Sequence, residues 1–372
     1  MKTLNKDCVC VDDFEKYALQ TLPKSVADYY KSGANDQQTL KENVEAFKRL
    51  LFRTRCLGDV SNRNLETYVQ GKRIPFPVGI APTAMQRMAH PDGEIATAKG
   101  AAEEGVIMIL STLSTTSIED VAKAAPVATR WLQLYIYKDR KTTSNLVQRA
   151  ERAGFSAIVL TVDTPIFGNR LADARNKFAP PPHLRLANFD ATDAKSVVSS
   201  QSETGSNLSI YINSMFDPSL TWKDIKWLKQ ITSLPIIVKG VLTAEDAVLA
   251  VENGVSGILV SNHGARQLDG VPAAIEALPE VVRAVANRCE VYMDGGVRTG
   301  TDILKALALG AKMVFIGRPI LWGLAHSGED GVKRVLQMLK QEFDHGLALL
   351  GCSSIKDIKP SMVVRKEYYS KL

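Results

Sequence analysis

Short runs of apolar residues recur along most of the chain, and each run is followed by a stretch with the pattern of an amphipathic helix. The runs are continuous rather than alternating, which is typical of parallel strands buried on both faces. Eight such runs are enough to close a ring of strands. They occupy residues 77–81, 106–111, 130–135, 157–163, 235–240, 257–262, 290–296 and 313–318.

The stretches between the runs are predicted helices. Several begin with a capping signal, such as SIED, TAED or TGTD, and several end at a glycine. Eight strands alternating with eight helices predict a TIM (β/α)₈ barrel, a fold of the α/β class. A doubly wound open sheet is the alternative, but no G-x-G-x-x-G follows the first strand. The helices are expected at 91–104, 117–125, 142–153, 221–231, 243–253, 272–287, 299–309 and 331–350.

Two regions interrupt this repeat within what we expect to be a single domain over residues 1–372. Residues 1–75 form an N-terminal helical segment, with helices around 11–20 and 22–32 and a basic, irregular remainder that leads into the barrel of residues 76–350. Residues 180–218 are a long insertion after the fourth strand, opening with PPPHL and then rich in Ser, Thr and Asn. Loops of this length are often lids, so we expect a mobile cover over the barrel mouth.

The tail, residues 351–372, ends in Ser370, Lys371 and Leu372. A C-terminal S-K-L is an address that the peroxisomal import receptor recognises. We therefore expect the protein in the peroxisome.

The charge pattern argues against several classes of partner. The formal net charge is +6, but the charges are interspersed without a basic block, so we expect no nucleic-acid partner. No apolar run is long enough to span a bilayer, so we expect no membrane contact. The five cysteines are Cys8, Cys10, Cys56, Cys289 and Cys352. Their scattered spacing fits reduced thiols of an intracellular protein, with no metal site.

Polar residues follow the apolar ones at every predicted strand, at the end where barrel enzymes carry their active sites. After the sixth strand, SNHGARQLDG places His263 three residues before Arg266. Histidine can accept a proton near neutral pH, and arginine can hold a carboxylate through two parallel hydrogen bonds. After strands seven and eight, DGGVRTG and GRP combine glycines with Arg298 and Arg318, which predicts a phosphate site. The pattern fits a phosphorylated cofactor beside a small organic acid.

Several motifs in the same order resemble the FMN-dependent 2-hydroxy-acid oxidases, the family that includes glycolate oxidase. They are APTAMQRMAHPDGE, RWLQLYIYKDR, LTVDTP, SNHGARQLDG, DGGVRTGTDILKALALGA and FIGRPILWGLA, and the resemblance extends from about residue 10 to about residue 355. It implies FMN as the cofactor, and oxidation of an (S)-2-hydroxy acid to the 2-oxo acid while O₂ is reduced to H₂O₂. It also implies a homotetramer or a larger homo-oligomer.

The resemblance further implies roles for individual residues. His263 is expected to be the catalytic base, and Asp163 the carboxylate that pairs with it once it is protonated. The resemblance leaves open whether His263 takes the Cα proton or the hydroxyl proton. Tyr135, Arg170 and Arg266 are expected to bind the substrate. The expected cofactor contacts are Pro82, Thr83, Ala84, Ser111, Gln133, Thr161, Lys239, Ser261, Asp294, Gly295, Gly296, Arg298, Gly317 and Arg318.

Two positions depart from the short-chain members of the family. Ala27 stands where a tyrosine is expected before DYY, and Leu113 stands where a tryptophan is expected after the second strand. Both changes would leave room for a substrate longer or bulkier than glycolate. Three alternatives stay open: a dehydrogenase with an acceptor other than oxygen, a non-catalytic flavin-binding barrel, and purely structural roles for single residues, such as a loop-capping Asp163.

Overall fold

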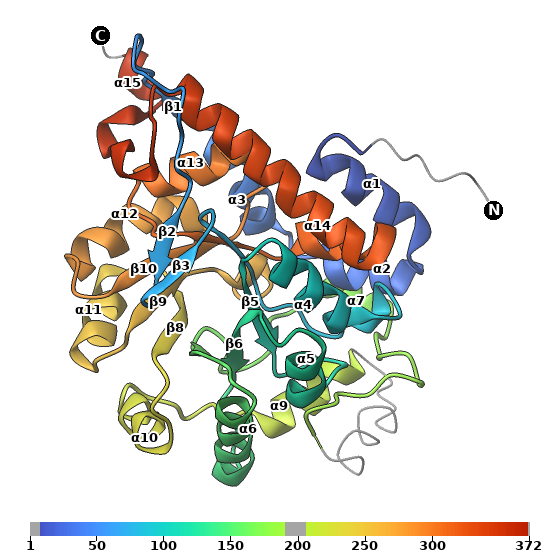
Figure 1. The fold of residues 1–372 in the computed structure, drawn as a ribbon. Helices are drawn as coiled ribbons and strands as arrows, with labels where there is room; N and C mark the ends of the chain where they lie inside the picture. The colour runs from blue at the N-terminus through green and yellow to red at the C-terminus, as the bar shows by residue number, and fades with distance from the viewer. Residues whose placement is uncertain (1–7, 190–205, 371–372) are drawn as a thin grey trace.

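The computed structural model describes residues 8–189 and 206–370 (Figure 1). Its centre is a closed barrel of parallel strands in the ring order β10-β11-β4-β5-β6-β7-β8-β9, which confirms the predicted fold. The observed strands are shorter than the apolar runs because the last residues of several runs already turn into the loops above the barrel. Their bounds are β4 (Val78–Ile80), β5 (Ile107–Ser111), β6 (Thr129–Leu134), β7 (Ile158–Thr161), β8 (Ile236–Val241), β9 (Gly257–Val260), β10 (Glu290–Asp294) and β11 (Val314–Ile316).

Helices surround the barrel, and most match their predicted ranges within two or three residues (Figure 1). Three begin at the predicted capping residues Ser117, Thr243 and Thr299, whose hydroxyls accept a hydrogen bond from the backbone N–H three residues later. The barrel helices are α4 (Gly93–Glu103), α5 (Ile118–Ala124), α6 (Arg140–Arg152), α10 (Lys223–Ile231), α11 (Ala244–Glu252), α12 (Ala274–Val285), α13 (Gly300–Ala308) and α14 (Arg318–Leu349).

The barrel interior is a packed core, not a channel. Inward-facing side chains from several strands fill it, among them Trp131, Tyr292 and Phe315, whose rings lie 5.6–5.9 Å apart. The N-terminal end of the barrel is closed by the hairpin of β2 (Thr67–Val69) and β3 (Lys72–Ile74). There, the Gln70 side chain donates to the Tyr292 hydroxyl and the Ser256 carbonyl. Substrate access is therefore confined to the opposite end.

The N-terminal segment contains more structure than the sequence predicts. Helices α1 (Val11–Thr21) and α2 (Lys24–Lys31) are confirmed, but the remainder expected to be irregular contains a third helix, α3 (Gln38–Lys48). Strand β1 (Leu50–Phe52) then pairs antiparallel with β12 (Val363–Arg365) near the C-terminus. Short helices flank β12: η3 (Ile355–Asp357), η4 (Pro360–Met362) and α15 (Glu367–Ser370), which ends just before Lys371 and Leu372, both outside the described residues.

The prediction for the last barrel helix was wrong at its start. Helix α14 begins at Arg318 and bends at Ser327 and Gly328, so the predicted range 331–350 covers only its second part. Gly323 and Gly331 lie on either side of the bend, and a Cβ on Gly331 would come within 1.8 Å of the Gly323 carbonyl oxygen. These glycines hid the first part of the helix in the sequence, because glycine disfavours helix interiors.

The insertion after β7 is partly helical rather than a loop throughout. Helix α7 (Leu171–Arg175) precedes it, and α9 (Asn207–Met215) forms its end, with Leu208 and Ile212 buried. Residues 190–205 of the predicted cover, which was residues 180–218, lie outside the described residues. After α9, the backbone of Phe216 pairs with the backbone of Tyr137, a residue that follows the end of β6.

Within the described residues, none of the helices is apolar over the length that a bilayer crossing requires. No disulfide joins the cysteines. The described part of the chain also shows no group of three or more His, Cys, Asp or Glu side chains placed to hold a metal ion.

Candidate active site

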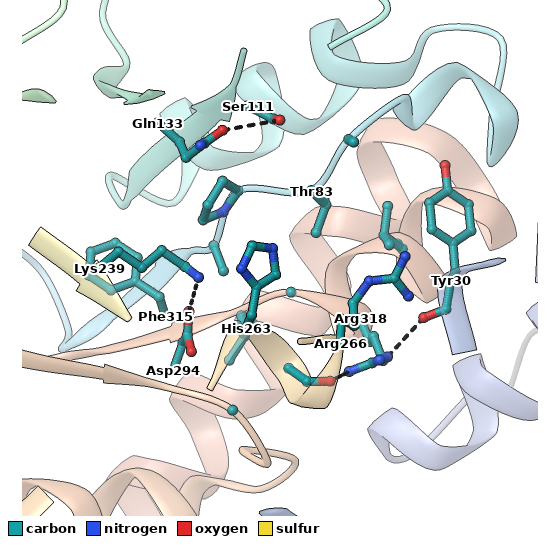
Figure 2. A pocket seen from close by; sticks show the side chains of 18 of the residues that line it. Tyr30, Thr83, Ser111, Gln133, Lys239, His263, Arg266, Asp294, Phe315 and Arg318 are labelled. Atoms are coloured by element: carbon teal, nitrogen blue, oxygen red, sulfur yellow. Dashed lines mark hydrogen bonds and ion pairs between the residues drawn. The ribbon is translucent and has the colours of Figure 1, made fainter. Parts of the chain in front are cut away.

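One cavity at the C-terminal end of the barrel is lined by residues that lie in the strands or in the loops that follow them (Figure 2). Every site residue predicted from the sequence lines it except Asp163 and Ser261, which lie just behind its wall. The lining residues among those predicted are Pro82, Thr83, Ala84, Ser111, Gln133, Tyr135, Thr161, Arg170, Lys239, His263, Arg266, Asp294, Gly295, Gly296, Arg298, Gly317 and Arg318.

His263 lies at the centre of the view in Figure 2, after the end of β9 and within the short helix η2 (His263–Ala265). Its Nδ1 lies 2.8 Å from Asp163 Oδ1, and Thr164 Oγ1 donates to the same carboxylate oxygen at 2.8 Å. Because the carboxylate binds Nδ1, the proton of the neutral ring sits on Nδ1 and Nε2 is left able to accept one.

The surroundings of His263 and Asp163 favour the neutral form of the imidazole and the charged form of the carboxylate. Burial lowers the pKa of His263 below its ordinary value, and the nearby Asp163 carboxylate only partly offsets that effect. Burial alone would raise the pKa of Asp163, but the His263 and Lys239 charges outweigh it and leave the pKa below its ordinary value. At neutral pH the histidine is therefore neutral and the aspartate charged, as proton abstraction by the histidine requires.

Lys239 is a buried cation in the wall of the cavity. Its Nζ lies 3.6 Å from Asp294 Oδ2 and donates to Ser261 Oγ at 3.1 Å. Ser261 Oγ also accepts the His263 backbone N–H, so Ser261 holds the lysine and the histidine in place from behind. Asp294 Oδ1 is buried and has no hydrogen-bond partner among the described residues.

A second group of cations lies on the other side of His263. Arg266 Nη1 donates to the carbonyls of Tyr29 and Ser32, and Arg318 donates to those of Tyr30, Ser32 and Gly264. The carbonyls at the end of α2 thus orient both arginines, and Figure 2 shows the bond from Arg318 to the Tyr30 carbonyl.

Acidic residues act on these guanidinium groups only at longer range, Asp173 on Arg170 and Arg266, and Asp302 on Arg298. Burial, with the adjacent Arg266 charge, lowers the pKa of Arg170 to about 10. Burial likewise lowers the pKa values of Arg298 and Arg318. Within the described residues, no ion pair joins any of these arginines to an acid. Such a concentration of buried positive charge is suited to anionic ligands.

The remaining wall of the cavity is apolar and aromatic. It contains Leu113, as predicted, but not Ala27. Leu113 lines the cavity as expected, together with Phe167 and Leu321. Ala27, by contrast, is buried in α2 but does not line the cavity, whereas Tyr29 does. A tyrosine ring from α2 is therefore present at the site, so Ala27 does not leave the room that the sequence suggested.

Tyr29 and Tyr30 also line the cavity, and neither was predicted as a site residue, although both belong to the DYY stretch. Tyr29 stacks on Phe178 at 4.4 Å, and its ring also lies 4.8 Å from the Arg266 guanidinium carbon. Two adjacent aromatic residues ending an amphipathic helix were the available signal. Only the packing of α2 against the barrel mouth reveals which ring faces the cavity.

A buried carboxylate supports the wall that contains Leu113. Glu94 accepts hydrogen bonds from the backbone N–H groups of Gln86 and Thr115, and from the hydroxyls of Thr115 and Thr116. These bonds connect the loop after β4 to the loop after β5. As a result, the position of Thr83 on the first loop is fixed relative to Leu113 on the second loop.

The cavity residues fit FMN. Gly295 and Gly296 have φ values of 93° and 83°, a conformation that favours glycine, and they lie beside the half-buried Arg298 and Arg318. Backbone N–H groups and arginines in this arrangement suit a phosphate. Lys239 and the unpartnered Asp294 Oδ1 lie further along the cavity, where a cation and an acceptor suit a flavin ring and its hydroxylated side chain.

A (β/α)₈ barrel whose cavity contains glycines beside arginines, a buried lysine and a histidine paired with a carboxylate suits a flavin-dependent oxidoreductase. Comparison with known proteins agrees: the FMN-dependent dehydrogenase family matches residues 18–365. The chain belongs to that family, and FMN is its cofactor. Its curated relatives carry the names of 2-hydroxyacid and glycolate oxidases, which supports an oxidoreductase acting on the CH–OH group of a 2-hydroxy acid.

Curated relatives and solved structures lead to the same class. The chain is 54% identical to human 2-hydroxyacid oxidase 1 over 355 residues, which is 95% of this chain and 96% of the relative. It is 56% identical to glycolate oxidase of Spinacia oleracea over 353 residues, 95% of each chain. A crystal structure of mandelate oxidase with (S)-4-hydroxymandelic acid superposes with a TM-score of 0.91 at 40% identity, covering 96% of this chain and 99% of that one.

Proposed function

We propose that the protein oxidises (S)-2-hydroxy acids to 2-oxo acids, with O₂ as the electron acceptor and H₂O₂ as the second product. The observation that carries this proposal is the His263–Asp163 pair, which lies in one site with Arg170 and Arg266. A base beside two carboxylate-binding arginines suits a substrate whose hydroxyl and carboxylate are on neighbouring carbons.

The arginines position the acid. Arg170 and Arg266 bind the substrate carboxylate, and the Tyr135 hydroxyl donates to the substrate. Tyr135 is well placed to stay a donor, because burial raises the pKa of its phenol far above neutral pH. Stacking of its ring on Phe216, 4.2 Å away, restricts the orientation of the phenol.

His263 takes the proton that leaves the substrate, and Asp163 stabilises the imidazolium that results. FMN, when bound, would supply the two-electron redox chemistry that links the substrate to O₂. Lys239 would be among the residues that hold the cofactor, and its positive charge would favour an anionic form of it. The balance is R–CHOH–COO⁻ + O₂ → R–CO–COO⁻ + H₂O₂.

The substrate side chain is expected to lie against Leu113, Phe167 and Leu321, which favours apolar side chains. We therefore propose that the enzyme accepts longer or bulkier 2-hydroxy acids in addition to glycolate. This part of the proposal rests on Leu113. Ala27 does not support it, because Tyr29 supplies a tyrosine ring at the site.

The test is to mix the FMN-loaded protein, without oxygen, with glycolate, lactate, 2-hydroxybutyrate, 2-hydroxyoctanoate and mandelate, and to follow flavin bleaching. Fast bleaching by the (S) acids with apolar side chains is the expected result. If none of these acids bleaches the flavin, the proposal is wrong.

Reoxidation then distinguishes an oxidase from a dehydrogenase that uses another acceptor. The relatives with oxidase names favour the oxidase. Mixing the reduced protein with oxygenated buffer should restore the oxidised flavin within the turnover time and release one H₂O₂ per flavin. Reoxidation much slower than turnover with an artificial acceptor would instead support the dehydrogenase.

We further propose that the enzyme is located in the peroxisome. We also propose that it forms a homotetramer or a larger homo-oligomer. The C-terminal Ser370, Lys371 and Leu372 support the location, although Lys371 and Leu372 lie outside the described residues. A fluorescent protein fused before residue 1 should reach peroxisomes, and removal of the last three residues should leave the fusion in the cytosol. Light scattering of the purified protein gives the assembly size.

A further inference from the structure

A pair of buried asparagine side chains connects the N-terminal segment to the residue that precedes His263. Asn43, on α3, donates through Nδ2 to Asn262 Oδ1 at 2.9 Å, and Asn262 Nδ2 donates back to Asn43 Oδ1 at 2.7 Å. Both side chains are buried, with exposed fractions of 3% and 4%. Two bonds between two buried amides make a rigid connection, because neither amide can rotate alone without leaving a polar atom unpaired.

Backbone contacts fix the orientation of each amide. Asn262 Oδ1 also accepts the Ala265 N–H at 3.1 Å, and Asn43 Oδ1 also accepts the Ala274 N–H at 3.3 Å. Each oxygen is thereby assigned, which leaves each Nδ2 to donate to the partner oxygen. Asn262 Nδ2 donates in addition to the Pro272 carbonyl.

The segment that Asn262 caps has an uncommon backbone. His263, Gly264 and Ala265 have φ values of 58°, 61° and 63°, so three successive residues are left-handed and two of them are not glycine. Non-glycine residues pay for this conformation in free energy and keep it only where surrounding contacts impose it. The Asn262 side chain holds the Ala265 N–H at the far end of the turn, and Ala34 N donates to the Ala265 carbonyl.

Helix α3 also contacts the loop of Gly295 and Gly296, which is predicted to bind phosphate. A Cβ on Gly296 would lie 1.8 Å from the Asn43 carbonyl oxygen, so the helix backbone and the loop are in close contact. The same residue of α3 therefore contacts the loop of Gly296 through its backbone and the turn of His263 through its side chain.

We propose that Asn43 is a positioning residue for His263. It orients the Asn262 amide, which holds the left-handed turn that aims the imidazole at the substrate. The inference rests on the proposed function for the part that His263 plays in the reaction. Asn43 lies in the N-terminal segment, 219 positions before Asn262 in the chain. It acts on His263 through the turn and does not contact the substrate.

The test compares Asn43→Ala with Thr39→Val, a matched control one turn earlier on α3. Thr39 is also fully buried, and its hydroxyl bonds to the Val271 carbonyl and the Gly270 N–H, so its loss weakens the contact between α3 and the loop after η2 but leaves Asn262 untouched. Asn43→Thr is the second variant if Asn43→Ala does not fold, since it is uncharged, has a similar volume and loses the amide that bonds to Asn262.

Three measurements are made on the FMN-loaded proteins: thermal unfolding, anaerobic flavin reduction by a saturating 2-hydroxy acid, and the His263 imidazole titration by NMR. We expect both Asn43→Ala and Thr39→Val to lower the melting temperature. Only Asn43→Ala should slow flavin reduction, by about 10-fold or more, and only it should move the His263 titration.

An Asn43 variant that loses stability but keeps the parent reduction rate and the parent imidazole titration would overturn the inference. Failure of the proposed function gives a different result: the parent itself is not reduced by any hydroxy acid. The NMR titration would still test the coupling of Asn43 to His263 in that case, because it requires no turnover.

Discussion

His263 Nδ1 lies 2.8 Å from Asp163 Oδ1, although the two residues are 100 positions apart and follow different strands of the barrel. The carboxylate fixes the ring tautomer and provides a counter-charge for the imidazolium that forms when the ring accepts a proton. The same Oδ1 accepts the Thr164 hydroxyl, so the carboxylate is itself held in position.

Replacing Asp163 with Asn should remove the counter-charge and keep the shape. We expect flavin reduction by the substrate to slow by about 100-fold or more, while FMN stays bound. Stopped-flow bleaching measures the rate, and the visible spectrum reports the bound cofactor. Asp246→Asn, a change at an exposed helix start, is the control and should react like the parent. A full-speed Asp163→Asn enzyme would show that the carboxylate is only structural.

The pH dependence of kcat/KM should report His263 as a base. The rate should be constant at neutral pH and fall on the acid side, as the imidazole becomes protonated. Because burial lowers the pKa of His263, this fall should lie below the pH at which a solvent-exposed histidine titrates. In Asp163→Asn the acid limb should move to still lower pH, since Asp163 raises the pKa of His263. An acid limb that moves upward would contradict the assignment.

Leu113 should control how large a substrate side chain the site accepts. Leu113→Trp fills part of the cavity, so kcat/KM for 2-hydroxyoctanoate should fall by about 10-fold or more, while glycolate is affected less. Steady-state rates across the acid series measure the change. Leu113→Met, of similar volume, is the control and should keep the parent preference. Equal losses for all acids in Leu113→Trp would place the substrate side chain elsewhere.

Gly240 should be required for the position of Asp163. Its φ is 113°, and a Cβ there would lie 2.6 Å from Asp163 Cγ. Gly240→Ala should therefore slow flavin reduction as well as lower the melting temperature. Gly71→Ala is the matched control, because Gly71 also has a positive φ, of 75°, but a Cβ would meet nothing within 4 Å. We expect Gly71→Ala to cost stability alone. If both variants kept the parent reduction rate, the contact with Asp163 would be unimportant.

The barrel and most of its site were predictable because the relevant signals are local. Each strand is a continuous apolar run, and the residue that follows it, such as Lys239 after the core of β8, points into the cavity by the geometry of the fold alone. Motifs such as SNHGARQ then placed His263 and Arg266 in one loop. The structure brings these residues together as the sequence predicted.

What escaped prediction depends on contacts between distant segments. Asn43 and Asn262 are separated by 219 residues, and nothing in the sequence around Asn43 indicates its partner. Val26, Ala27, Tyr29 and Tyr30 are all buried in α2, so the helical pattern could not tell which of them faces the cavity. The first part of α14 was missed because its glycines serve the close approach at Gly323 and Gly331, a tertiary requirement that opposes local helix preference.

The cluster of Arg170, Arg266, Arg298 and Arg318 also has a consequence for the stability of the protein. Four positive groups gathered at one cavity, with acids acting on them only at longer range, repel one another, and the folded chain bears that cost until anions bind. A phosphate-bearing cofactor would therefore act as a counter-ion for the fold as well as a reagent, and we expect FMN to raise the melting temperature of the protein.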